Sequence, residues 1–211
     1  MASTTPTSIE KPHTALIFIE FQAEWIDEDG VLFQRLVRDK NPFRQAVARA
    51  AETLAVARAN GWTVVHAGLD LRDDPAYRLF AGGEGVLGLR AAIPRAGTWT
   101  GDGAAFVPPF APQYGEFILR GRSGASVLNN SNLDAFLRNN RIDTLILLGF
   151  ATHVCVESTL RDAHDRGFNV YVVTDGCAAF THAQDEHFQQ HILHHFGAGI
   201  EAASLVKQLE V

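Results

Sequence analysis

The chain has few of the residues that hold small extracellular proteins together, because only two of its 211 residues are cysteines. A chain of this length buries roughly 70% of the surface that its unfolded form exposes, so it needs no disulfide or structural metal to hold a core. Cys155 and Cys177 are therefore predicted to be free thiols in a reducing, cytoplasmic compartment.

Positive charge and long apolar runs are also scarce. The sequence has 18 basic and 24 acidic residues, a formal net charge of −6, and no cluster of lysine or arginine. Nucleic acids and anionic membranes require a basic surface, so neither is expected as a partner. No apolar run reaches the roughly 18 to 20 residues of a membrane span, and the N-terminus lacks the pattern of a secretory signal. The predicted partners are a small-molecule substrate and copies of the same chain.

Short apolar runs alternate along the chain with stretches of helical periodicity. The predicted strands cover residues 14–21, 62–69, 116–120, 143–150 and 169–175, with a weaker sixth at 200–205, and the clearest helices cover 42–61, 132–140 and 157–167. This alternation is typical of βα units around a buried parallel sheet. We predict an α/β fold with three αβα layers and a six-stranded, mostly parallel, doubly wound sheet of the Rossmann type.

The chain is predicted to form one domain. Residues 1–13 are polar and rich in Ser, Thr and Pro, so we expect a flexible tail, followed by a single domain over residues 14–211. Residues 71–115 are rich in Gly and Pro and lack periodicity. Long irregular segments of this kind are often binding loops, and both a lid and a subunit contact stay open for this one.

Cys155 lies where a predicted strand turns into a predicted helix. Ligands bind at the carboxyl ends of strands in open α/β sheets, and the positive end of a helix lowers the pKa of a thiol placed there. The position therefore favours a nucleophile with a lowered pKa, although a buried packing role is an equal alternative. Cys177 lacks this context and is predicted to be structural.

Two charged residues follow other predicted strands. Glu20 ends the first apolar run, where a buried carboxylate is costly unless it is paired or functional, and Arg122 follows the third strand beside Arg120. Considered alone, each also fits an ordinary strand-end or loop charge. Together with Cys155 they would supply the proton carrier and the cation that a cysteine nucleophile needs.

The sequence GFATHVCVESTLRDAHDRGFNVYVVTDGCAA, supported by IFIEFQ and GRSGASVLNNSNLDAFLR, resembles the isochorismatase-like cysteine hydrolases. The resemblance extends from about Thr14 to Leu209, in a family that includes nicotinamidases and hydrolases of N-carbamoylsarcosine, biuret and ureidoacrylate. It implies Cys155 as nucleophile, with Glu20 and Arg122 as the other two catalytic residues. At these two positions the family carries Asp and Lys, so both substitutions keep the charge, but arginine is a poor proton shuttle.

The same resemblance implies an oxyanion hole formed by the backbone N–H groups of Ala151 and Cys155, with a cis peptide bond between Phe150 and Ala151. Aromatic and imidazole side chains beside the three motifs are candidates for substrate binding, with core or loop packing as the alternative for each. These are Phe21, Trp25, Phe150 and His153.

No cofactor or metal is predicted. GEGVLG at residues 83–88 resembles a dinucleotide-binding glycine pattern, but it does not directly follow a strand. His187, His191 and His195 are spaced by four residues without the glutamate of an HExxH site. Some nicotinamidases have a metal site after the second strand, and the matching segment here has only His66.

The leading hypothesis is a cysteine-dependent hydrolase that cleaves a C–N bond in a small amide or ureide through a thioester. One alternative is a vinyl-ether hydrolase of the isochorismatase type, in which the acid is required and the thiol is dispensable. Another is a catalytically silent relative that has a binding or assembly role. The family resemblance also implies a homo-oligomer.

Overall fold

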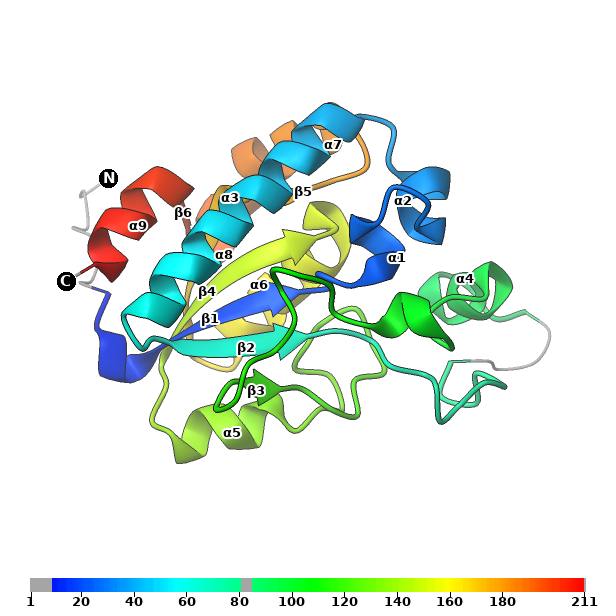
Figure 1. Ribbon diagram of the computed structural model, residues 1–211, viewed down its shortest axis with the longest axis horizontal. Helices are drawn as coiled ribbons and strands as arrows, with labels where there is room; N and C mark the ends of the chain where they lie inside the picture. The colour runs from blue at the N-terminus through cyan, green and yellow to red at the C-terminus, as the bar shows by residue number, and fades with distance from the viewer. Residues whose placement is uncertain (1–8, 81–84, 211) are drawn as a thin grey trace.

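Six parallel strands form one sheet in the order β3-β2-β1-β4-β5-β6 within residues 9–80 and 85–210, which the computed structural model describes. The strands are β1 (Thr14–Ile19), β2 (Thr63–Ala67), β3 (Phe117–Ile118), β4 (Thr144–Phe150), β5 (Asn169–Ala178) and β6 (Ala198–Ile200). The chain builds β1, β2 and β3 outward in one direction and then crosses to β4, so β1 and β4 are neighbours at the switch point of the topology (Figure 1). Ligands bind at such a point in open α/β sheets.

Both faces of the sheet are buried, which explains why its strands are continuously apolar. Leu16 and Phe18 of β1 pack into one hydrophobic cluster, whereas Ala15, Ile17 and Ile19 pack into a second cluster on the other face. This alternation follows from the two-residue period of a strand.

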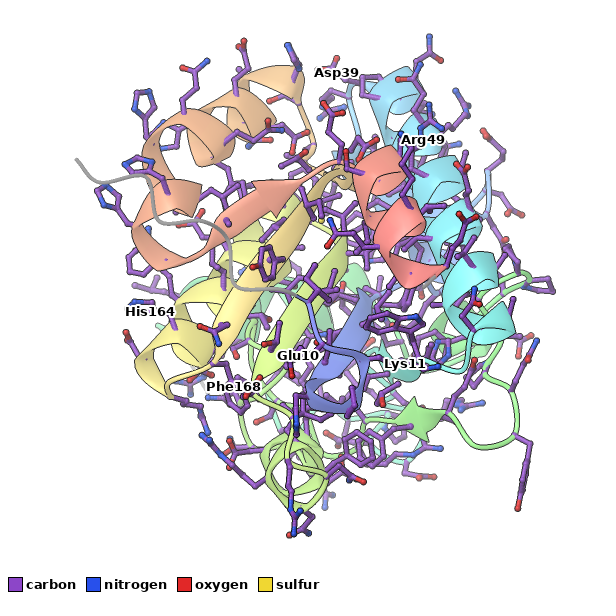
Figure 2. All side chains as sticks on the ribbon, turned by 90° about the vertical axis from the view of Figure 1, so that its left-hand side faces the viewer. Glu10, Lys11, Asp39, Arg49, His164 and Phe168 are labelled. Atoms are coloured by element: carbon purple, nitrogen blue, oxygen red, sulfur yellow. The ribbon has the colours of Figure 1, made fainter. Side chains whose placement is uncertain are left out.

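Helices cover the two faces as two outer layers. The first layer contains α3 (Lys40–Ala59) and α9 (Ala202–Leu209), and the second contains α5 (Leu133–Asn139), α6 (Glu157–Asp165) and α8 (Leu193–Phe196). Figure 2 looks at the sheet from one end and shows Arg49 on the side of α3 and His164 on the opposite side, in α6. The predicted three-layer α/β fold with a doubly wound sheet is therefore confirmed, and all its strand pairs are parallel.

The sixth predicted strand was placed wrongly. Residues 200–205 were expected to be extended, but β6 ends at Ile200 and α9 begins at Ala202. Ala202, Leu205 and Leu209 are fully buried, and their spacing of three and four residues is helical rather than alternating.

Short helices gather beyond the carboxyl ends of the strands. They are α1 (Ala23–Ile26), α2 (Val31–Leu36) and α4 (Leu89–Ala96), and Figure 1 shows them together past the arrowheads of β1 and β4. The sequence analysis did not predict α4, because this helix lies in a segment rich in Gly and Pro and contains Pro94. No helix in the described part of the chain is long and apolar enough to cross a membrane.

Residues 1–8, 81–84 and 211 lie outside the described residues, and with them most of the expected tail and the first two residues of the glycine pattern at 83–88. The described end of the expected tail contacts the domain. Lys11–His13 forms a short 3-10 helix, Ile9 packs against the core, and the His13 ring hydrogen-bonds to Arg141 O at 2.9 Å.

A partly buried ion cluster anchors the segment before β3. Arg58 of α3 donates to both carboxylate oxygens of Glu116 at 2.7 and 2.9 Å, and His66 Nε2 lies 2.7 Å from Glu116 Oε2. Although burial alone raises the pKa of Glu116, hydrogen bonds from Arg58, the Gln113 backbone and His66 lower that pKa to about 2.

Candidate active site

Three predicted catalytic residues meet at the switch point of the sheet. Glu20 directly follows β1, Arg122 lies after β3, and Cys155 lies after β4. Glu20 is 1% exposed, Arg122 is 4% exposed and Cys155 is 7% exposed. The sequence therefore brings a carboxylate, a guanidinium and a thiol together in a buried position, although they are far apart along the chain.

Glu20 and Arg122 form a buried ion pair. Arg122 Nη2 lies 2.8 Å from Glu20 Oε1, and the Trp25 indole N–H donates to Glu20 Oε2 at 2.8 Å. Despite the short separation, neither Glu20 Oε1 nor Arg122 Nη1 makes a hydrogen bond of good geometry to another described residue. Both side chains also interact with the Cys155 thiol, so the three groups form one buried cluster.

The backbone around Glu20 is held in an unusual conformation. Glu20 has φ +61°, in the left-handed region that non-glycine residues seldom occupy, and its N–H donates to Ala67 O at 2.8 Å. Two residues later, the buried Gln22 amide hydrogen-bonds to the backbone of Leu69 and Ala104. Residues held in this way cluster at functional sites.

Arg122 is fixed by its own loop. Its Nε donates to Gly124 O at 2.9 Å and its Nη2 donates to Ala125 O at 2.7 Å. The planar guanidinium thus engages two carbonyls and Glu20, an arrangement that depends on the several fixed donors of arginine. Burial by itself lowers the pKa of Arg122, but the charges of Glu20 and Cys155 raise it above its usual value, so Arg122 acts as a permanent cation.

Cys155 lies in the helical turn that follows β4. Thr152–Val156 forms one π-helical turn that continues directly into α6, and the thiol interacts with both Glu20 and Arg122. Burial and the negative charge of Glu20 raise the pKa of the Cys155 thiol, and Arg122 only partly opposes them. The expectation of a lowered thiol pKa is therefore wrong for the site without substrate, because burial outweighs the helix end.

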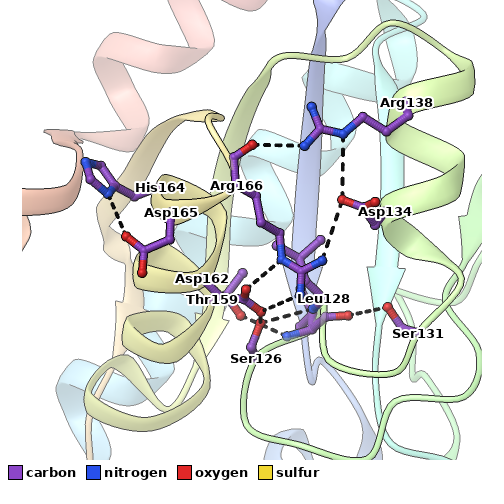
Figure 3. Close-up of polar contacts among 11 residues, drawn as sticks. Ser126, Leu128, Ser131, Asp134, Arg138, Thr159, Asp162, His164, Asp165 and Arg166 are labelled. Atoms are coloured by element: carbon purple, nitrogen blue, oxygen red, sulfur yellow. Dashed lines mark hydrogen bonds and ion pairs between the residues drawn. The ribbon is translucent and has the colours of Figure 1, made fainter.

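A polar network joins the Arg122 loop to the helix of Cys155. Ser126 Oγ donates to Asp162 of α6 at 2.6 Å, and the Val127 N–H donates to Thr159 Oγ1 at 3.1 Å (Figure 3). Arg166 binds the other oxygen of Asp162 at 2.6 Å. This network fixes the loop and the helix relative to each other, and no motif in the sequence predicts these contacts.

The thiol, the carboxylate and the guanidinium face a cavity of about 300 Å³. The residues that line it come from the strand ends, α1, α2, α4 and the loops between them. They are Glu20, Trp25, Leu32, Arg35, Leu36, Leu69, Leu89, Ala92, Ile93, Ala96, Thr98, Trp99, Arg122, Gly124, Ala125, Ala151, Val154, Cys155 and Phe180. Sequence reasoning missed the contribution of α2 and α4. The spacing of Leu89, Ala92, Ile93 and Ala96 is helical and was the signal that could have identified α4.

The four predicted substrate-binding residues occupy different positions. Trp25 lines the cavity and holds Glu20. Phe21 and Phe150 are fully buried in the core, with ring centroids 4.9 Å apart. His153 packs edge-on against Phe180, with ring centroids 4.6 Å apart, and burial lowers the pKa of His153. The geometry supports packing roles for Phe21, Phe150 and His153.

Ala151 and Cys155, the two expected oxyanion-hole residues, both line the cavity. The peptide bond between Phe150 and Ala151 is cis, as the resemblance implied. The other thiol, that of Cys177, is buried in β5 and its Sγ lies 3.7 Å from Leu147 O.

Within the described residues, no group of three or more His, Cys, Asp or Glu side chains is arranged to hold a metal ion. His66, the only histidine of the segment where some nicotinamidases bind a metal, pairs with Glu116. His187 and His191 of the predicted stripe lie with ring centroids 5.2 Å apart.

Comparison with known families agrees with this geometry. The Isochorismatase domain family matches residues 14–204, which include all three strand-end residues of the site. The chain belongs to the isochorismatase family. The resemblance predicted from the motifs is thereby confirmed across nearly the whole domain.

Curated isochorismatase-family relatives include ureidoacrylate amidohydrolases. The protein of this name, RutB, from Methylobacterium radiotolerans is 31% identical over 194 residues, with 81% of this chain and 69% of the relative covered. RutB from Stutzerimonas stutzeri is 32% identical over 197 residues, with 88% and 76% covered.

Solved isochorismatase-family structures share the fold. A cysteine hydrolase from Pseudomonas syringae pv. phaseolicola superposes with a TM-score of 0.83 at 23% identity and covers 99% of both chains. An N-carbamoylsarcosine amidase from Thermoplasma acidophilum has a TM-score of 0.63 at 26% identity, with 90% of this chain and 96% of the other covered.

Proposed function

We propose that this isochorismatase-family protein hydrolyses a C–N bond in a small amide or ureide, with Cys155 as its nucleophile. The observation that carries the proposal is the buried cluster of Glu20, Arg122 and Cys155 on one cavity. The relatives named as a ureidoacrylate amidohydrolase and an N-carbamoylsarcosine amidase support this reaction class.

The raised thiol pKa determines the first step. Because the thiol is protonated at neutral pH, its proton must leave as the sulfur attacks, and the Glu20 carboxylate is the base that interacts with it. The sulfur then forms a bond to the substrate carbonyl carbon, and the carbonyl oxygen becomes an oxyanion. The Ala151 and Cys155 N–H groups are proposed to stabilise this oxyanion, and Arg122 balances the negative charge at Glu20 and sulfur.

Glu20 is the proposed proton carrier in both halves of the reaction. Its newly acquired proton passes to the leaving nitrogen, the C–N bond breaks, and an amine or ammonia departs from a Cys155 thioester. Glu20 next takes a proton from water, the water oxygen attacks the thioester carbon, and the C–S bond breaks. The departing sulfur recovers its proton from Glu20, which restores the starting state.

The test is the turnover of amides and ureides by Cys155→Ala and Glu20→Ala variants, each compared with the unaltered protein. The proposal predicts that both variants lose turnover on any amide that the unaltered protein cleaves. A vinyl-ether hydrolase would keep turnover in Cys155→Ala and lose it only in Glu20→Ala. A catalytically silent protein would form no thioester and would turn over none of the amides and ureides tested.

Assembly and location are further proposals. We propose a cytoplasmic location and a homo-oligomeric assembly, and the exposed leucines Leu36, Leu87 and Leu89, which are 37%, 84% and 40% exposed, support the assembly. Light scattering during size-exclusion chromatography tests the assembly, and a monomer at micromolar concentration would contradict it.

A further inference from the structure

The wall of the catalytic cavity is almost entirely hydrocarbon beyond the three reactive groups. Thirteen of its nineteen lining residues are apolar, and they come from α1, α2, α4 and the segments that follow β2, β3, β4 and β5. They are Trp25, Leu32, Leu36, Leu69, Leu89, Ala92, Ile93, Ala96, Trp99, Ala125, Ala151, Val154 and Phe180. Such a wall favours a substrate that removes apolar surface from water.

The volume of the cavity sets the size of the part of the substrate that it can enclose. A cavity of about 300 Å³ has room for about ten non-hydrogen atoms, if each occupies about the 30 Å³ that a water molecule takes in the liquid. A primary amide group uses three of these atoms, so the rest of the substrate contains about seven. This matches a phenyl ring or a short alkyl chain.

The cations of the cavity offer little to an anionic substituent. Arg122 is already paired with Glu20 at 2.8 Å. Arg35 of α2 is exposed and has a long contact of 3.5 Å to Ala96 O, so solvent and salt screen its charge. Among the described residues, no other basic side chain lines the cavity.

The other polar side chains of the wall are uncharged. Thr98 Oγ1 and the Trp99 indole nitrogen are buried, and neither has a hydrogen-bond partner among the described residues. These groups suit a neutral acceptor such as a carbonyl or ether oxygen. A carboxylate in the same place would lose its hydration without gaining a cation, which is strongly unfavourable.

We propose that the physiological substrate is a small amide or ureide whose non-reacting part is uncharged and mainly hydrocarbon, rather than one that carries a carboxylate. This inference rests on the proposed function, because the amide must reach Cys155. It adds a specificity: α2 and α4 form an apolar wall that excludes anionic substituents.

The test compares amides that are matched in size but differ in charge. 6-Methylheptanamide and 3-methylbut-1-enylurea are the neutral probes, and adipamate and ureidoacrylate are their anionic counterparts, in which a carboxylate replaces the terminal isopropyl group. Ammonia release by the full chain gives kcat/KM for each. We expect the neutral member of each matched pair to be favoured by about 100-fold or more, because the apolar wall leaves a carboxylate unpaired. Equal values within threefold, or a preference for the anionic probes, would overturn the inference.

Binding to Cys155→Ala separates this inference from the proposed function. Calorimetric titration of that variant with 6-methylheptanamide and adipamate measures the preference of the cavity without turnover. If the variant binds the neutral amide selectively but the unaltered protein cleaves no amide, the proposed function is refuted. The preference of the cavity for neutral ligands is then still supported. Selective binding of the anionic amide that is lost in Arg35→Gln would instead assign the mouth to a carboxylate.

Partly exposed wall leucines supply variants that are expected to fold. Leu36→Gln and Leu89→Gln place an amide in the mouth of the cavity, whereas Leu79→Gln changes an exposed leucine that does not line it. We expect kcat/KM for the neutral probes to fall about fivefold in each wall variant and to stay unchanged in Leu79→Gln. Unchanged kcat/KM in both wall variants would contradict the proposed contact.

Discussion

Replacing Glu20 by Gln should change thiol reactivity and turnover in opposite directions. Burial and the Glu20 charge raise the pKa of the Cys155 thiol, while Arg122 lowers it. Glu20→Gln removes the carboxylate charge and leaves the guanidinium, so the thiolate becomes easier to form. Turnover nevertheless falls, because the proton carrier is lost.

The expected sizes follow from the short contacts in the cluster. Two unit charges about 4 Å apart interact by about 4 kcal/mol at an effective dielectric constant of 20. Even a third of that energy, about 1.4 kcal/mol, corresponds to tenfold. We therefore expect Cys155 alkylation by iodoacetamide at pH 7 to accelerate at least about tenfold, while amide turnover falls by about 10² to 10⁴.

Peptide mapping of the alkylated protein supplies the measurement and an internal control. Burial and the charges of Asp185 and Asp175 raise the pKa of the Cys177 thiol, and Glu20→Gln changes none of these causes, so Cys177 should alkylate equally slowly in both proteins. Glu20→Asp keeps the charge and should retain slow alkylation. If alkylation and turnover fall together in Glu20→Gln, the electrostatic account of the thiol is refuted, and if turnover is unchanged, Glu20 is not the proton carrier.

Three further predictions concern stability. Arg122→Met leaves the Glu20 carboxylate buried without its cation and should lower the free energy of unfolding by about 3 to 5 kcal/mol in urea titrations. Arg122→Lys keeps the charge and should lower it by less than half of that. Equal losses in the two variants would contradict the role of the charge. Gly149 has φ +129°, and a Cβ there would overlap the Ile19 carbonyl oxygen. Gly149→Ala should therefore lower the free energy of unfolding by about 3 kcal/mol or more. Gly167→Ala, where the added Cβ meets open space, should lower it by about 1 kcal/mol. Because the pKa of Glu116 falls from 4.5 to about 2 on folding, its stabilisation is complete above pH 4.5 and is lost as the pH falls toward 2. Urea midpoints measured from pH 5 to pH 2.5 should therefore fall more steeply in the unaltered protein than in Glu116→Gln, and parallel curves would refute this.

The parts of the fold that depend on local pattern were predictable from the sequence. Strands buried on both faces are continuously apolar, so β1 and β4 were found within two residues of their ends. The error at residues 200–205 arose because a six-residue apolar run has too few positions to distinguish a two-residue period from a helical one. The short helices α2 and α4 were not predicted, because each spans only about two turns or fewer and the helical spacing in α4 is interrupted by Pro94.

The site divides in the same way. Glu20, Arg122 and Cys155 were identified because each follows a strand and matches a family motif. The raised pKa of the Cys155 thiol was not predicted from the sequence. It depends on burial and on the neighbouring Glu20 charge, which arise only in the folded structure. The hydrogen bonds from Arg122 to two backbone carbonyls could not be predicted from the sequence either. They explain how arginine fits where relatives carry lysine.

The proposed mechanism requires that Cys155 becomes covalently acylated during C–N hydrolysis. Rapid acid quenching of the protein during turnover of a cleaved amide, followed by intact-mass and peptide mass spectrometry, tests it most directly. We expect an adduct with the mass of the substrate acyl group on Cys155 of the unaltered protein, and no such adduct on the Cys155→Ala variant. Steady-state turnover with no adduct on Cys155 at any quench time, together with full turnover in Cys155→Ala, would contradict it.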